Sequence, residues 1–217
     1  MMKLNDFTFV ILADQVGSRA STDHVPTALA RLERSLGGRL TLPFERTAGD
    51  ELQGLSSDPG VVVEAVCQLT RLEGWRIGIG AGEVETPLPA STREARGEAY
   101  VAARKAIGNA RSSPTQLALV DASTVSGDGY GDRVDDVTDA ETALWLLRGV
   151  LQQRSQEGWE LMDLLHQGLT GVEASTKLGI SPSAVSQRLS RARRTETERA
   201  AGLATRLLAR LNRGAPA

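Results

Sequence analysis

Two spacings of apolar residues alternate along the first part of the chain. Some runs are continuously apolar or alternate at a period of two, as strands do, while others repeat their apolar residues every three or four positions, as helices do. Gly37-Gly38 marks a helix end, and Asp58-Pro59 marks a helix start. The predicted strands cover residues 7–13, 40–44, 51–55, 75–84 and 116–121, and the predicted helices cover 26–36, 59–69 and 97–110.

This order of elements predicts an α/β (α+β) domain over residues 1–123. The order β-α-β-β-α-β-α-β is that of a ferredoxin-like split β-α-β sheet with one extra helix and strand. Residues 124–135 are rich in Gly, Asp and Ser and are expected to be a linker. Residues 136–217 have helical spacing throughout, beginning at a capping box over Thr138–Glu141, and are expected to form an all-α domain.

The most specific pattern in the chain is a helix-turn-helix over residues 171–192. Such a unit needs a small residue where the two helices cross, and Ser175 stands there. Gly179 supplies the positive φ that the turn requires, and Val185 supplies the apolar residue that faces back from the second helix. Ser181 and Pro182 form a helix cap and first turn. The motif predicts binding to double-stranded DNA.

The second helix of this motif would be the recognition helix. Its polar side chains are short hydroxyl groups and long hydrogen-bond donors, which suit base edges and phosphates. The structural alternative is a helical hairpin that merely packs, with arginines that are only solvated. The residues expected to contact DNA are Ser181, Ser183, Ala184, Gln187, Arg188, Arg191, Arg193 and Arg194.

The distribution of charge agrees with a DNA-reading end. The net charge is −2, yet residues 154–217 carry ten Lys and Arg against six Asp and Glu, while residues 1–153 carry fifteen against twenty-one. Charge also fluctuates by chance along any chain, so this asymmetry by itself decides nothing.

The last helix has an apolar face that is unsuited to water. Ala200, Leu203, Ala204, Leu207, Leu208 and Leu211 repeat at helical spacing. This face either packs on the same chain or forms a seam between two copies. A homodimer would suit a regulator that reads paired half-sites.

Other features of the sequence argue against a zinc cluster, a standard nucleotide-binding motif and a membrane span. Cys67 is the only cysteine and is expected to be buried packing, and His24 and His166 fall in different predicted domains, so no Cys- or His-based zinc cluster is readable. The glycines of residues 78–82 fit neither a P-loop nor a dinucleotide motif, and permit close packing or access of a ligand. The N-terminal apolar run is too short to span a bilayer and lacks signal-peptide features, so a cytoplasmic protein is expected.

The N-terminal pattern resembles class III nucleotide cyclases and the hairpin of diguanylate cyclases. The resemblance lies in a strand ending at Asp14, the hairpin sequence RTAGDELQGL with Gly49 and Asp50, and the strand RIGIG. It also includes a helix with the triplet Ala-Ala-Arg, whose arginine is Arg104. It implies a nucleotide site at Asp14, Gly49, Asp50 and Arg104, with Asp14 and Asp50 holding Mg²⁺ or Mn²⁺ for two-metal phosphoryl transfer.

Two departures from the cyclase pattern argue against turnover. Phe44 stands where adenylyl cyclases have a base-reading Lys, and Tyr100 stands where they have a transition-state Asn. A retained pocket that senses a nucleotide is therefore favoured over catalysis. The remaining alternative is that Asp14 and Asp50 only cap a strand and a turn.

Nearly the whole chain resembles the SatD family, bacterial proteins described as DNA-binding. The similar segments are FVILADQVGSR, RTAGDELQGL, WRIGIGAGEVE, STREARGEAYVAARKA and the helix-turn-helix. The resemblance implies a transcriptional regulator with a cyclase-like N-terminal domain that senses a nucleotide or metal, or mediates assembly. The alternatives are an active nucleotide cyclase with a DNA-targeting appendage, and a scaffold that binds no DNA.

Overall fold

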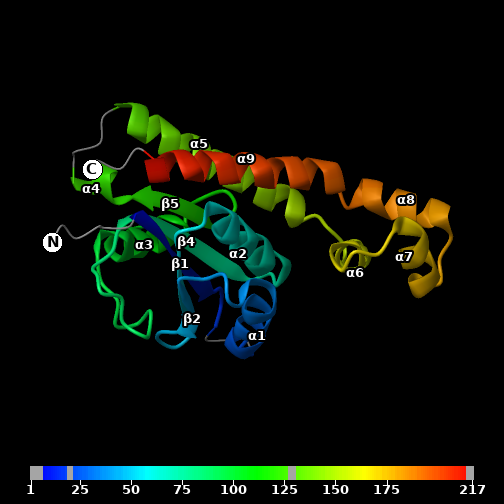
Figure 1. Cartoon of the computed structure of the whole chain (residues 1–217), viewed down its shortest axis with the longest axis horizontal. Coiled ribbons are helices and arrows are strands. Elements are labelled where there is room, and N and C mark those ends of the chain that lie inside the picture. The colour runs from blue at the N-terminus through cyan, green and yellow to red at the C-terminus, as the bar shows by residue number, and fades with distance from the viewer. Residues whose placement is uncertain (1–6, 19–21, 127–130, 214–217) are drawn as a thin grey trace.

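The computed structural model describes residues 7–18, 22–126 and 131–213. It has a mixed α/β body followed by helices (Figure 1). The strands are β1 (Phe7–Gln15), β2 (Leu42–Arg46), β3 (Glu51–Ser56), β4 (Trp75–Glu83) and β5 (Leu117–Asp121). The helices are α1 (Val25–Leu36), α2 (Pro59–Arg71), α3 (Glu98–Asn109), α4 (Ala122–Ser126), α5 (Gly131–Leu151), α6 (Gln156–His166), α7 (Gly171–Leu178), α8 (Pro182–Arg191) and α9 (Arg194–Arg213).

The strands form one five-stranded sheet in the order β2-β3-β1-β4-β5. Strand β1 is antiparallel to both β3 and β4, and β2 is antiparallel to β3, while β5 runs parallel to β4. In the units β1-α1-β2 and β3-α2-β4, a strand of the other unit therefore lies between the two strands that the helix connects. The expected order of strands and helices over residues 7–121 is confirmed.

Helices cover both faces of the sheet. The apolar side chains of α1 and α2 pack with Phe9, Ile11, Ile77 and other residues of one face, and α3 packs on the opposite face with Val10 and Leu12. This arrangement follows from the alternation of side chains along each strand.

Close packing explains the glycines of β4. A Cβ atom on Gly80 would lie 2.2 Å from the backbone oxygen of Ala99 and from the backbone nitrogen of Ala103. A Cβ atom on Gly78 would lie 2.4 Å from the backbone nitrogen of Ile107. Of the two interpretations of these glycines, close approach of α3 is the one that the structure supports.

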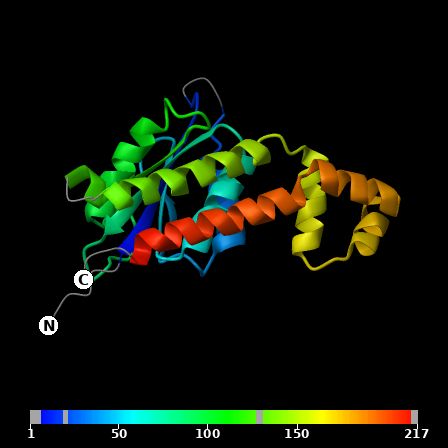
Figure 2. The ribbon, with the colours of Figure 1, turned by 90° about the horizontal axis from the view of Figure 1, so that it is seen from above.

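The last two long helices, α5 and α9, belong to the core of the body. Figures 1 and 2 show them running side by side over the sheet. Leu144 and Leu147 of α5 and Leu208 and Leu211 of α9 have no exposed surface and share one hydrophobic cluster with α1, α2 and the sheet. The apolar face of α9 thus packs on its own chain. The homodimer stays a prediction, and this face is not available to form it.

The helix start expected at Thr138 is wrong, because α5 begins at Gly131. Thr138 lies inside the helix, where its hydroxyl donates to the backbone oxygen of Val134 at 2.8 Å. The first turn is anchored by Arg133, whose guanidinium donates to the Asp121 carboxylate at 2.5 Å and to the Leu211 backbone oxygen at 2.7 Å. This long-range anchor is invisible to local sequence patterns.

The expected linker at 124–135 is helical where it is described. Residues 124–126 belong to α4 and 131–135 to α5, while 127–130 lie outside the described residues. Within the described ranges, none of the helices combines the length and hydropathy needed to cross a membrane.

Candidate functional site

Helices α6, α7 and α8 form a small core of their own. Leu161 and Leu164 of α6 pack with Ala174 of α7 and Val185 of α8, and Leu165, Leu169, Leu178, Ile180 and Leu189 surround them. The three helices gather at one end of the molecule, away from the sheet (Figures 1 and 2). We call residues 156–191 the terminal module.

The local signals expected for the helix-turn-helix are present. Thr170 and Glu173 form a capping box at the start of α7, with Glu173 accepting from the Thr170 backbone N–H at 2.7 Å. Gly179 ends α7 with φ 65° and ψ 32°, the left-handed conformation that the turn needs. Ser181 caps α8, its hydroxyl accepting from the Ala184 backbone N–H at 3.1 Å.

The two helices cross where the sequence places small and apolar residues. Ser175 of α7 is 5% exposed and Val185 of α8 is 3% exposed. The Ser175 hydroxyl donates to the backbone oxygen of Val172 at 2.7 Å, so its burial leaves no unsatisfied donor. The crossing therefore leaves the opposite side of α8 open to solvent.

The side chains expected at DNA fall into two groups. Ser181, Ser183, Gln187, Arg191, Arg193 and Arg194 are exposed, while Ala184 and Arg188 are half-buried. Helix α8 contains no acidic residue, and its last turn carries Arg188 and Arg191. Arg193 lies in the connection to α9 with φ 50°, and Arg194 is paired with Glu198 at 2.7 Å on its own helix.

Arg154, which sequence reasoning missed, holds the end of α8. Its guanidinium is buried, donates to the Ala192 backbone oxygen at 2.7 and 2.9 Å, and donates to the Thr197 hydroxyl at 2.7 Å. It also lies 4.4 Å from the centre of the Trp159 ring. These contacts fix the orientation of α8 relative to α6 and α9. A single arginine after α5 carries no sequence signal for such a role.

A second candidate site lies where β1 ends. Asp14, Gly49 and Asp50 line one hollow of about 740 Å³ together with Arg76 and Arg111. The remaining lining residues are Gln15, Gly17, Ser18 and Asp23. The structure thus brings together three of the four residues expected at a nucleotide, and adds two arginines that sequence reasoning did not single out.

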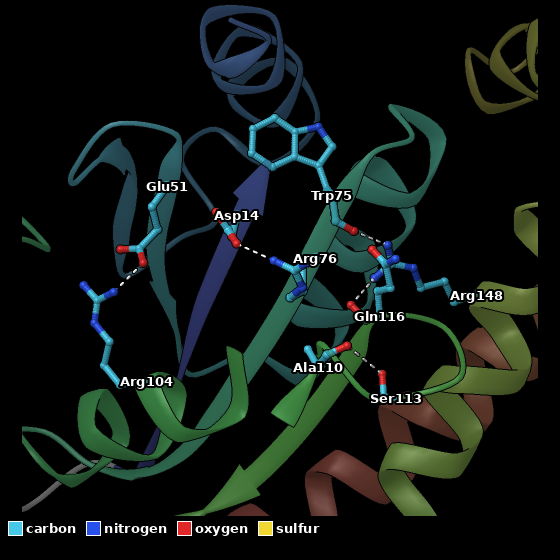
Figure 3. A network of polar contacts seen from close by, with 9 residues as sticks. All are labelled: Asp14, Glu51, Trp75, Arg76, Arg104, Ala110, Ser113, Gln116 and Arg148. Carbon is cyan, nitrogen blue, oxygen red and sulfur yellow. Dashed lines mark hydrogen bonds and ion pairs between the residues drawn. The ribbon is translucent and has the colours of Figure 1, made fainter. Parts of the chain in front are cut away.

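Asp14 is a carboxyl of this hollow whose pKa is raised. Burial and the nearby charge of Asp50 raise its pKa, while Arg76 opposes this shift through an ion pair at 2.5 Å (Figure 3). Asp14 and Asp50 are therefore close enough to repel each other. One of the two carboxylate oxygens of Asp14, Oδ2, is already bound to Arg76.

The fourth expected residue, Arg104, is paired elsewhere. Its guanidinium bonds the carboxylate of Glu51, the neighbour of Asp50, and it does not line the hollow (Figure 3). Within the described residues, no three His, Cys, Asp or Glu side chains gather as a metal site. The metal site at Asp14 and Asp50 stays a prediction.

The two residues that depart from the cyclase pattern, Phe44 and Tyr100, both contact other residues of the body. Phe44 is 9% exposed, and its ring would contact any Cβ atom on Gly54 at 2.9 Å. The hydroxyl of Tyr100 is 3.2 Å from that of Thr92, and burial raises the pKa of Tyr100. Neither side chain supplies a cation or an amide to a bound nucleotide.

Comparison with family models, curated proteins and solved structures found no match to this chain. The resemblance to the SatD family and to nucleotide cyclases therefore remains an interpretation of the sequence motifs.

Proposed function

We propose that the protein is a transcriptional regulator that binds double-stranded DNA through α8. The observation that carries the proposal is the combination of a left-handed Gly179, a capped α8 and a buried crossing at Ser175 and Val185. Together these features favour a helix that presents one polar, acid-free side to a partner. The major groove of double-stranded DNA is wide and deep enough to accept such a helix.

The exposed residues of α8 have distinct roles in this proposal. Ser183, Ala184 and Gln187 face base edges from the first two turns, and Arg188 and Arg191 reach a guanine edge or a phosphate. Arg193 contacts the DNA backbone. Arg194 contributes less, because a phosphate must compete with Glu198 for its guanidinium.

Recovery of bound DNA tests this proposal. The full chain is incubated with fragmented genomic DNA, captured, and the retained fragments are sequenced. Enrichment of a shared sequence by the unmodified chain, lost in the double variant Gln187→Ala with Arg191→Ala, is the expected result. A flat distribution of fragments for both proteins would instead indicate a scaffold that does not read DNA.

For the body, we propose a ferredoxin-like, cyclase-like domain of the SatD type, in a cytoplasmic homodimer, that senses a nucleotide with Mg²⁺ or Mn²⁺ or mediates assembly. The proximity of Asp14 and Asp50 supports a cation-dependent ligand, since a cation relieves the repulsion of two carboxylates. The alternative, an active cyclase, lacks the side chains expected at Phe44 and Tyr100. Incubation with ATP or GTP and Mn²⁺ is expected to give no cyclic product.

A thermal-shift screen tests nucleotide sensing. A nucleotide that binds only the native chain must raise the melting temperature. We expect the rise to require Mg²⁺ or Mn²⁺ and to vanish in Asp50→Asn, while the matched control Asp135→Asn, an exposed residue of α5, keeps it. The absence of any shift in melting temperature would leave a structural role for the hollow at Asp14. The proposed homodimer is tested separately, by sedimentation of the full chain.

A further inference from the structure

A second and larger hollow separates the body from the terminal module. It encloses about 790 Å³ and is lined by α1 and α2 on one side and by α6 and α9 on the other. Its size falls within the range of small-molecule sites, about 300–1,000 Å³. None of the residues expected at the nucleotide or at DNA lines it.

Three arginines of the body converge on this hollow. Arg71 binds the carboxylate of Asp163 through two hydrogen bonds, at 2.5 and 2.7 Å. Arg31 lies 3.9 Å from the same carboxylate and donates to Gln68 at 2.7 Å. Arg34 lines the hollow without an ion-pair partner among the described residues. The Asp163 carboxylate thus serves two of the three guanidinium groups, those of Arg71 and Arg31.

The other acidic residues of the hollow do not balance this charge. Glu64 is paired with Arg39 at 2.6 Å and Glu198 with Arg194 at 2.7 Å, and neither arginine lines the hollow. Burial and the charge of Arg71 both lower the pKa of Arg31. The site therefore retains an excess of positive charge that an anion would relieve.

The inner wall of the hollow is apolar. Val63, Leu151 and Met162 are each about 3% exposed and line it. Burial raises the pKa of the Cys67 thiol to about 12, so this side chain stays neutral at physiological pH. Trp159 completes the wall, with Arg71 5.1 Å from its ring centre. An apolar wall beside an arginine cluster suits a ligand with two unlike ends.

We propose that this hollow binds a small amphipathic anion, with its acidic group on Arg31, Arg34 and Arg71 and its apolar body against Val63, Leu151 and Met162. The carboxylate of Asp163 marks the position of the acidic group, because it already accepts the bidentate hydrogen bonds of Arg71 that a free acid would accept. Ligand and Asp163 compete, so binding loosens the contact between α6 and α2.

The site is connected to α8 through α6. Trp159 and Asp163 are one turn apart on this helix, and Arg154, which lies over Trp159, also holds the Ala192 oxygen at the end of α8. A ligand that displaces Asp163 therefore acts on α6, the helix whose Trp159 contacts Arg154. The consequence for DNA rests on the proposed function, whereas the binding itself does not.

Titration with 8-anilinonaphthalene-1-sulfonate, a fluorescent amphipathic anion, tests the site on the full chain. Saturable binding to one site is expected. Arg34→Gln should weaken it by about three-fold, a typical effect for an exposed charge. Asp163→Asn should strengthen it by about ten-fold, because a competing charged hydrogen-bond partner is removed. Inorganic phosphate should compete with the dye for the arginines.

Two matched controls separate a specific site from a general effect of charge. Arg210→Gln on α9 and Glu160→Gln on α6 make the same charge changes at exposed positions outside the hollow, and should leave the affinity unchanged. Melting curves verify that each variant is folded. Equal affinity in all variants, or no saturable binding to either the unmodified chain or Asp163→Asn, would overturn the proposal. Neither outcome depends on whether the protein binds DNA.

Discussion

Gly80 has the tightest surroundings of the glycines in β4. A Cβ atom at this position would lie 2.2 Å from main-chain atoms of α3, which a rotamer change cannot relieve. Gly108 on α3 is a natural contrast, since a Cβ atom there would meet nothing within 4 Å. The same chemical change therefore has opposite consequences at a glycine inside the contact between β4 and α3 and at a glycine on the exposed side of α3.

Gly80→Ala is expected to lower the free energy of unfolding by about 1–3 kcal/mol or more, because α3 must move off the sheet. Gly108→Ala is expected to raise it by about 0.5–1 kcal/mol, because alanine favours a helix. Urea unfolding of the two variants measures both effects. Equal stability of the two would mean that α3 does not pack on β4 as described.

The thiol of Cys67 provides a test of burial at the second hollow. Burial raises its pKa to about 12, so stability contributed by the neutral thiol is present below pH 9.0 and is lost as the pH approaches 12. Alkylation by iodoacetamide should accelerate steadily with pH between about 7.5 and 9.5 in the folded chain, without levelling off. In denaturant the rate should level off near an ordinary thiol pKa. A plateau near pH 9 in the folded protein would contradict the raised pKa of this half-buried thiol.

At the scale of elements, α8 depends on the residue that caps it, Ser181. Ser181 caps the helix with its hydroxyl, while Ser183 is exposed two positions later and accepts no such bond. Ser181→Ala should lower the free energy of unfolding by about 1 kcal/mol, and Ser183→Ala should change it by less than about 0.5 kcal/mol. Calorimetry on both variants makes the comparison. If Ser181→Ala leaves the free energy of unfolding unchanged, the Ser181 hydroxyl does not stabilise the start of α8.

Helix α9 is a core element of the body. Leu208 has no exposed surface, whereas Leu203, on the same helix, is 44% exposed. Leu208→Ala is expected to cost about 2–5 kcal/mol in the free energy of unfolding, because it leaves a cavity. Leu203→Ala should cost less than about 0.5 kcal/mol. If neither change alters stability and both alter sedimentation, α9 would be a seam between copies.

Elements whose signals are local are predictable from the sequence. The strands, the helices α1–α3 and the helix-turn-helix follow from periodicity, Gly179, Asp58-Pro59 and Ser181-Pro182. The start of α5 was missed because Arg133 acts through Asp121 and the backbone of Leu211. The ion pair of Arg71 with Asp163 joins residues 92 positions apart, and no spacing rule reports such a contact.

The same contrast applies to the candidate sites. Motifs placed Asp14, Gly49 and Asp50 at one hollow, because the hairpin and the strand end are local features that the sheet brings together. The partners of Asp14 and Arg104 were not predictable because, although Arg76 and Glu51 lie within the RIGIG and RTAGDELQGL segments, no spacing in the sequence pairs them with these residues. Buried arginines were missed for a similar reason. Arg148 donates to the backbone oxygens of Trp75 and Gln116, and burial lowers its pKa to about 10 (Figure 3).

For the whole molecule, the two long helices α5 and α9 connect the sheet to the terminal module. The chain leaves the body along α5, forms α6, α7 and α8, and returns along α9 to pack beside α2 (Figures 1 and 2). Arg154 and the pair of Arg71 with Asp163 join the two parts. Arg71 of α2 and Arg154 both lie over the ring of Trp159 on α6, so the contact between α2 and α6 adjoins the residue that holds the end of α8.

The most direct test of the account is the affinity of the full chain for a duplex recovered from genomic DNA, measured by fluorescence anisotropy. Gln187→Ala and Arg191→Ala should each weaken binding by about 1–3 kcal/mol through the loss of base contacts. The matched control Arg210→Ala, on the part of α9 away from α8, should leave it unchanged. Affinity should also fall steeply with salt. Equal affinities for the three variants and the unmodified chain would contradict DNA recognition by α8.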